Sequence, residues 1–237
     1  EDATITAVGN AQLMLKAGFT SAISFGSTYK IDVALRDAIN SGRLSGPRLL
    51  AAGRDLGATA SNIDSPGGLS QIADGPWALR KAVREQRRDR VNVVKIFLDG
   101  EAINAVNPPG ELSFCDEEVV AVVEEAHRRG MRVACHARSA AAVKQAVKAG
   151  VDFIGHANYL DQEAVDALAA KKDQIVVGPA IAWEVQYVAQ CESLGISKAT
   201  VRAQGYETEI AETVKTVEKL RAAGVRLVVG GDYGISI

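Results

Sequence analysis

The chain has few cysteines, an almost balanced charge and no long apolar run, and each of these absences excludes a class of protein. The three cysteines, Cys115, Cys135 and Cys191, form no CxxC pair. This argues against a disulfide framework and favours a reducing, cytoplasmic location. The 27 basic and 29 acidic residues nearly cancel, so no global charge indicates a nucleic-acid or membrane partner. No apolar run approaches the roughly 20 residues that span a bilayer.

Two further features are scarce or missing. No GxGxxG sequence opens a helix, which counts against a dinucleotide-binding open sheet. Histidine occurs only three times, as His127, His136 and His156. The first residue of the 237 is Glu1 rather than Met, and no targeting segment is visible, so we expect the true start of the protein to lie upstream.

What the chain does contain is a repeated unit of helix, glycine and short apolar strand. In the clearest copy, a helix predicted over 116–129 ends at Gly130, and a strand follows over 131–136. Glycine just past a helix end adopts the left-handed conformation that turns the chain into the next strand. Other helices are predicted over 3–17, 33–40, 76–90, 139–149, 161–172 and 197–223. This alternation predicts a parallel sheet covered by helices.

Seven strands can be read from the sequence. They end near Phe25, Ala52, Phe97, His136, His156, Gly178 and Gly230. A TIM barrel has eight, so the chain is predicted to be an α/β fold: one TIM-type barrel domain over residues 1–237, incomplete at its N-terminus. A doubly wound open sheet is the alternative. The segments 54–75 and 100–113 are expected to be long loops on the catalytic face.

Lys95 stands out because it lies inside Val93–Phe97, a run that should be buried on both faces. An unpaired buried ammonium costs several kcal/mol, so such a lysine is expected to be held neutral or to be chemically modified. A neutral lysine can act as a nucleophile, or take up carbon dioxide to form a carbamate that bridges two metal ions. The alternative is a lysine near the strand end whose ammonium reaches the barrel mouth.

His136 and His156 occupy equivalent positions on consecutive strands. Each lies six residues after a helix-ending glycine, ends an apolar strand and precedes an alanine. Both imidazoles should therefore lie side by side at the C-terminal rim of the barrel, where they would form half of a catalytic zinc site. A single histidine at a strand end would more often be structural. His127 lies near the C-terminus of a helix on its polar side, and we expect it at the surface without a functional role.

Asp232 follows the last apolar strand, after Val228-Val229-Gly230-Gly231. A carboxylate at this position could bind a metal and accept a proton from water. An ordinary Asp-Tyr-Gly turn is the alternative. Together with Lys95 and the two histidines on other strands, Asp232 completes a Lys–His–His–Asp set that is typical of a metal site.

The sequences around these residues resemble a known family. They are Val-Val-Lys95-Ile, Val-Ala-Cys-His136-Ala, Gly-Val-Asp-Phe-Ile-Gly-His156 and Val-Val-Gly-Gly-Asp232. They look like strands four, five, six and eight of the amidohydrolase superfamily, which are metal-dependent hydrolases with a TIM barrel. The stretches 136–161 and 35–49 resemble its prolidase/imidazolonepropionase-like branch. The resemblance covers essentially the whole chain.

The resemblance implies a role for each residue of the set. Lys95 would be a carbamylated bridging ligand, formed with carbon dioxide. His136 and His156 would bind the second metal, and Asp232 would bind the first metal and shuttle the proton. One or two divalent metal ions are implied, with zinc the favoured ion. Two features depart from the family: no His-x-His lies on a first strand, and the small β-sandwich domain is absent.

By this resemblance the chain would hydrolyse a carbon–nitrogen bond in a small-molecule substrate, which could be an amide, a dipeptide, a cyclic amide or a urea-like compound. Tyr159 and Arg138 lie just past the two histidines and are predicted to contact substrate, with the fork of Arg138 holding a carboxylate. Specificity is expected from the segments 54–75 and 182–206. A homo-oligomer is left open.

Two other readings remain open at this stage. One is an aldolase-type lyase on the same barrel, in which Lys95 forms a Schiff base without a metal. The other is a barrel that keeps the packing of the family but has no catalytic activity, because the first-strand histidines are missing.

Overall fold

The main element of the fold is a parallel β-sheet. The computed structural model describes residues 1–64, 68–102 and 107–232. In these residues seven strands form one sheet in the order β4-β3-β5-β6-β7-β8-β9. They are β3 (Asp55–Gly57), β4 (Ser70–Ile72), β5 (Val93–Phe97), β6 (Arg132–Ser139), β7 (Phe153–Tyr159), β8 (Val176–Gly178) and β9 (Arg226–Leu227). All pairings between these strands are parallel, as the alternation of helices and strands predicts.

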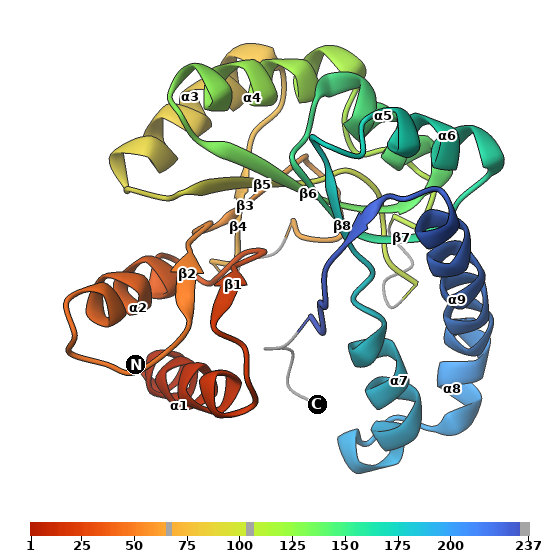
Figure 1. Cartoon of the computed structure of the whole chain (residues 1–237), viewed down its shortest axis with the longest axis horizontal. Coiled ribbons are helices and arrows are strands. Elements are labelled where there is room, and N and C mark those ends of the chain that lie inside the picture. Colours follow the sequence, from red (N-terminus) through yellow and green to blue (C-terminus); the bar gives the residue numbers. More distant parts are fainter. Residues whose placement is uncertain (65–67, 103–106, 233–237) are drawn as a thin grey trace.

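A second parallel pair, β1 (Ser21–Ile23) with β2 (Arg48–Leu50), forms a separate two-stranded sheet next to it. The carbonyl of Ala51 accepts hydrogen bonds from the backbone N–H groups of Asn92 (2.7 Å) and Val93 (3.1 Å), so β2 lies beside the start of β5. Further on, Leu56 of β3 is paired with Ile96. Residues 48–57 therefore contact β5 through the end of β2 and through β3. The strands form a curved wall (Figure 1), in which β3 lies between β4 and β5.

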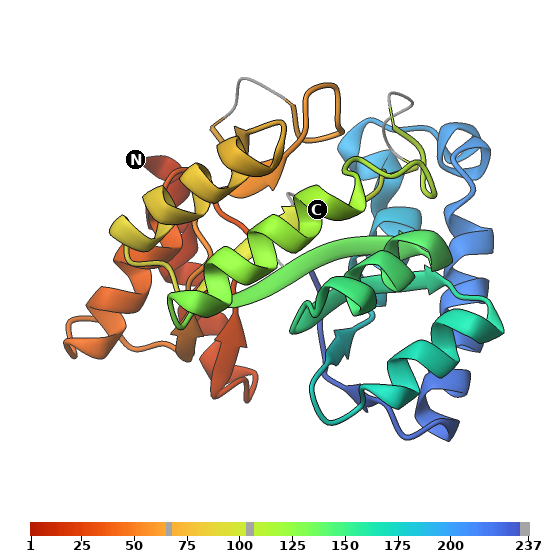
Figure 2. The same ribbon diagram turned by 90° about the horizontal axis from the view of Figure 1, so that it is seen from above.

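Helices form an outer layer around this wall (Figure 1). They are α1 (Asp2–Lys16), α2 (Ile31–Asn40), α3 (Pro76–Arg88), α4 (Asp116–Arg128), α5 (Ala140–Ala149), α6 (Gln162–Ala170), α7 (Ile181–Gln190), α8 (Lys198–Ala203) and α9 (Tyr206–Ala222), with a short 3-10 helix, η1 (Cys191–Leu194). Figure 2 shows α3 and α4 side by side. The core between the layers includes Val83 of α3, Val122 of α4 and Ile96 of β5. Among the described residues, no helix is both long and apolar enough to cross a membrane.

Glycine ends helices where the pattern predicts it, but it also divides one predicted helix. Gly150 has a φ of 86° at the end of α5, the left-handed conformation expected there. The single helix predicted over 197–223 is wrong, because Gly205, with a φ of 81°, separates α8 from α9. A residue without Cβ adopts this conformation at no steric cost, so the chain can turn there.

Two predicted loops also contain regular structure. The segment 54–75 includes β3 and β4, and the segment 182–206 includes most of α7 together with η1 and α8. The segment 54–75 reads as a loop because it is rich in Gly, Ser, Asp, Pro and Ala, and α7 was missed although it is ten residues long. In α7, Trp183 and Tyr187 are buried in a small aromatic cluster, so this helix is stabilised by tertiary packing rather than by its local sequence.

A buried carboxylate joins α3 to α4. The side chain of Glu125 has no exposed surface and accepts hydrogen bonds from the guanidinium groups of Arg84 (2.8 Å) and Arg129 (2.8 Å). The hydrogen bond from Arg84, aided by that from Arg129, lowers the pKa of Glu125 from 4.5 to about 2, although burial acts in the opposite direction. The ionised form is therefore favoured in the folded protein.

We expect Glu125→Gln to lower the free energy of unfolding at neutral pH by about 1–3 kcal/mol, because the buried side chain then no longer offers a charged acceptor to the guanidinium groups of Arg84 and Arg129. The loss should shrink as pH falls from about 4.5 toward about 2, since Glu125 of the wild type is then itself protonated. Urea unfolding at a series of pH values measures both effects. Glu124→Gln is the matched control, because Glu124 pairs with Arg80 at the exposed surface and should contribute less than about 1 kcal/mol. An equal loss in both variants at every pH would contradict the prediction.

Candidate metal centre

The register of β5, β6 and β7 brings His136 and His156 together. The sequence predicts that each histidine ends its strand, but β6 and β7 each continue for three more residues. His136 is paired with Phe97 on one side and with Gly155 on the other, and His156 is paired with Ala137. The two imidazole rings come to lie with their centroids 4.4 Å apart. His136 also stacks on Phe97, with ring centroids 3.8 Å apart, which holds its ring in place.

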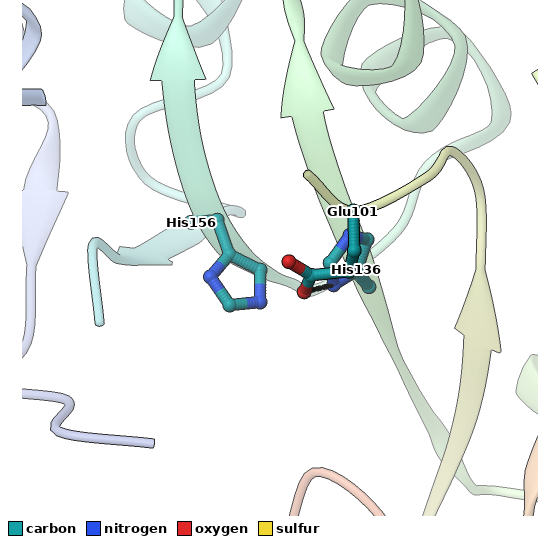
Figure 3. Close-up of side chains that lie close together, drawn as sticks. All are labelled: Glu101, His136 and His156. Atoms are coloured by element: carbon teal, nitrogen blue, oxygen red, sulfur yellow. Dashed lines mark ion pairs between the residues drawn. The ribbon is translucent and has the colours of Figure 1, made fainter. Parts of the chain in front are cut away.

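A carboxylate completes the group. Glu101 follows β5, and Figure 3 shows its side chain between the two histidines. The ligand atoms of Glu101, His136 and His156 all lie within 4.8 Å of one another, and Nδ1 of His136 is 3.6 Å from Oε1 of Glu101. In the sequence analysis Glu101 was only part of the predicted loop 100–113. The one feature that could have identified it as a ligand is its place as an acidic residue shortly after the strand of Lys95.

The electrostatics of this group suit a cation. Burial lowers the pKa of both His136 and His156 well below the usual range, so both rings are neutral and have a free lone pair. Nδ1 of His156 is buried without a hydrogen-bond partner in the part of the chain that the structure describes. Two neutral imidazoles and one carboxylate form a donor set that binds zinc in proteins. The residues present therefore fit a divalent metal.

The backbone at the end of β7 departs from regular strand geometry to form this site. His156 has a φ of 76° and Ala157 a φ of 56°, both in the left-handed region. The pairing between β6 and β7 also shifts after Ala137. A left-handed conformation costs a residue with a Cβ roughly 1–2 kcal/mol, and such irregularities at strand ends re-aim side chains near active sites.

Lys95 is buried as predicted, but it has a partner that the sequence analysis missed. Its Nζ lies 3.4 Å from Oδ2 of Asp55 and 3.3 Å from the carbonyl oxygen of Phe25, and only 4% of its side chain is exposed. Asp55 lies in β3, within the segment that was predicted to be a loop. Burial raises the pKa of Asp55 to about 6, even though Lys95 acts to lower it. Lys95 therefore lies against a buried carboxylate, and its modification to a carbamate stays a prediction.

Asp232 lies near His156. Its Oδ2 is 4.0 Å from Nε2 of His156, and its φ of 53° is also left-handed. Burial raises the pKa of this carboxyl group, and the positive charges of Lys95 and Arg138 act in the opposite direction. The structure thus places Asp232 next to the histidine pair, at the position where a proton acceptor is predicted.

Arg138 and Tyr159 lie in the same region, but their surroundings differ from the prediction. Arg138 is fully buried, and its guanidinium group pairs with Glu101 (2.8 Å), Glu184 (2.9 Å) and Glu209. Its fork is occupied by carboxylates of this chain. Tyr159 is half-buried, and burial together with the nearby Glu209 raises its pKa. Direct contact of either residue with substrate stays a prediction.

Comparison with known proteins identifies the family of this chain. The sequence profile of the amidohydrolase family matches residues 1–237. Ochratoxinase of Aspergillus niger is 31% identical over 179 residues, which are 66% of this chain and 37% of the relative. This chain therefore spans little more than a third of that curated relative.

Solved structures give the same result for the fold. A Xaa-Pro dipeptidase with bound methionine in the active site is 30% identical with a TM-score of 0.85, over 99% of this chain and 60% of the other. A putative prolidase from Bifidobacterium longum is 26% identical with a TM-score of 0.82, over 99% of this chain and 57% of the other. These relatives are TIM barrels, so the curved parallel sheet is part of such a barrel, and the chain belongs to the amidohydrolase family.

Proposed function

We propose that this chain provides the metal centre of a hydrolase that cleaves carbon–nitrogen bonds in an amide, dipeptide, cyclic amide or urea-like substrate. The observation that carries the proposal is the buried group of Glu101, His136 and His156, whose ligand atoms lie within 4.8 Å of one another. The similarity to ochratoxinase and to a Xaa-Pro dipeptidase supports an amide or peptide bond as the target.

Metal binding and proton transfer fall to different residues of the site. His136, His156 and Glu101 would hold a divalent ion, with zinc favoured by the two imidazoles, and Lys95 as its carbamate and Asp232 would complete the set. When bound, such an ion polarises a substrate carbonyl and makes a water molecule more acidic. Asp232 would accept the proton of the attacking water and pass it to the leaving nitrogen. Its raised pKa favours this exchange.

The experiment measures the hydrolysis of a panel of dipeptides and N-acyl amino acids. The rate is determined from the amount of free amine that is released. Removal of metal by a chelator should lower the rate by about 100-fold or more, because the ion contributes several kcal/mol to the reaction. Added zinc should restore it. Undiminished turnover by the metal-free protein would refute the proposal. Borohydride in the presence of substrate tests the lyase alternative, since it would trap a Schiff base on Lys95.

A further inference from the structure

The buried side chain of Arg138 contacts the carboxylate of the metal centre. Arg138 lies two positions after His136 in β6, and both side chains lie against Glu101. Nη2 of Arg138 donates a hydrogen bond to Oε1 of Glu101 (2.9 Å), and the same Oε1 is 3.6 Å from Nδ1 of His136. Among the residues that the structure describes, Arg138 is the hydrogen-bond partner of this carboxylate. The guanidinium group therefore sets the direction in which the carboxylate points.

The guanidinium group is itself held from its other side. Nη1 of Arg138 lies within hydrogen-bond distance of the carboxylates of Glu184 in α7 (2.9 Å) and Glu209 in α9. It is also 3.1 Å from the side-chain oxygen of Asn158, which lies two positions after His156 in β7. The helices α7 and α9 pack against each other on one flank of the molecule (Figure 1). Two helices and a neighbouring strand thus fix one arginine side chain.

The backbone on both sides of this contact is fixed by a second carboxylate. Asp99 has no exposed surface and follows β5 closely. Its two oxygens accept hydrogen bonds from the backbone N–H groups of Arg138 (2.9 Å) and Ser139 (2.9 Å) at the end of β6. It also accepts one from the N–H of Gly110 (3.2 Å), further along the loop that carries Glu101. The loop and the strand end are therefore tied together.

Charge alone does not explain an arginine at this place, because a guanidinium group beside a metal ion repels it. The carboxylates of Glu184 and Glu209 offset this positive charge, and neither they nor Arg138 have exposed surface. Within this group only Glu101 is exposed, with 15% of its side chain accessible. The buried group can therefore act on the metal centre through Glu101.

We propose that Arg138 is a positioning residue whose planar fork keeps the Glu101 carboxylate directed at the histidine pair. The inference rests on the proposed function, because it concerns the ion of the same site. Partners that orient a metal ligand contribute about 10–100-fold to metal affinity. Lysine has the same charge as arginine but no fork, so it should not replace Arg138.

The test is a double-mutant cycle on the zinc dissociation constant, measured on the intact protein by competition with a chromophoric chelator. Arg138→Lys should weaken zinc binding by about 10–100-fold although the charge is kept. Glu101→Ala removes a ligand and should weaken it by about 100-fold or more. Once Glu101 is gone, Arg138→Lys should cost less than about twofold more, because its effect passes through that ligand.

Arg132→Lys is the matched control of this cycle. Arg132 lies in the same strand, but it is exposed and pairs with Asp152 at 3.2 Å, so its replacement should leave the zinc affinity unchanged. If Arg138→Lys does not fold, Glu184→Gln and Glu209→Gln take its place, since each keeps the shape of the side chain. Each should weaken zinc binding about threefold or more, and only in the protein that retains Glu101.

A loss of equal size with and without Glu101 would overturn the positioning role, because the replaced side chain would then act through general packing. Unchanged zinc affinity in Glu101→Ala, or in the variants of the arginine group, would overturn it as well. The two proposals fail separately. Metal-dependent turnover combined with equal losses keeps the proposed function and removes the positioning role. Losses that need Glu101, in a protein whose turnover needs no metal, give the opposite result.

Discussion

Replacing His136 or His156 with alanine is expected to remove most of the bound metal and nearly all hydrolysis. Each substitution takes away one of the three ligand atoms that lie within 4.8 Å of one another. Loss of an outer partner of a metal ligand already costs about 10–100-fold in affinity, so loss of a ligand should cost at least about 100-fold. Hydrolysis should fall by a similar factor or more, because the reaction depends on the metal.

Elemental analysis after dialysis and the rate of amine release measure the two effects. His127→Ala is the matched control: His127 is the third histidine of the chain, and it pairs with Asp152 at 2.8 Å near the surface end of α4. It should keep both metal and activity. Full metal occupancy in the two site variants would show that the assignment of the ligands is wrong.

Lys95→Ala should also abolish activity, and short carboxylates added with bicarbonate should partly restore it. The amine of Lys95 must lose a proton and bind carbon dioxide to form a carbamate. This change would place a second anion beside Asp55, which lies 3.4 Å from the amine. Two buried anions in contact repel each other, so the carbamate is expected only when a divalent ion is bound. A carboxylate that occupies the vacated space would supply similar oxygen atoms.

The modification can be followed with isotope-labelled bicarbonate by NMR, in protein with and without zinc. We expect a carbamate signal that needs both zinc and Lys95 and that is lost after metal removal. The control is Lys144→Ala, since Lys144 is a surface lysine paired with Asp161 and Glu163. An active, zinc-loaded wild type with a plain lysine at position 95 would rule out the carbamate. Loss of function in Lys95→Ala without any rescue would favour the Schiff-base alternative, which borohydride trapping tests directly.

Much of the fold could be predicted because its signals are local. Each signal lies within about one helix–strand unit: the periodicity of a helix, the glycine at its end and the short apolar strand that follows. These signals predicted β1, β2 and β5 through β9 in the right order. The errors lie where local signals are weak. β3 and β4 lie in a segment rich in Gly, Ser, Asp, Pro and Ala, whose composition is that of a loop. A helical pattern alone cannot show that Gly205 takes a left-handed conformation.

The part of the candidate site that depends on strand order, the histidine pair, could be predicted from the sequence. His136 and His156 lie at equivalent places, three residues before the ends of the neighbouring parallel strands β6 and β7, so their approach follows from the sequence pattern. Glu101 could not be chosen in this way. It lies in a loop, where neither periodicity nor register sets the direction of a side chain, and only the folded chain brings it to His136.

The sequence by itself determined the alternation of helices and parallel strands, and with it the edge on which Lys95, His136 and His156 lie. Only the tertiary structure decided which charges meet there. Lys95 and its partner Asp55 are 40 positions apart, and Arg138 and Glu209 are 71 apart. The physical reason is that a buried charge must be paired with an opposite charge. The packing of the helices against the sheet determines which side chain is close enough to pair with it, and residues far apart in the sequence can be neighbours in the folded chain.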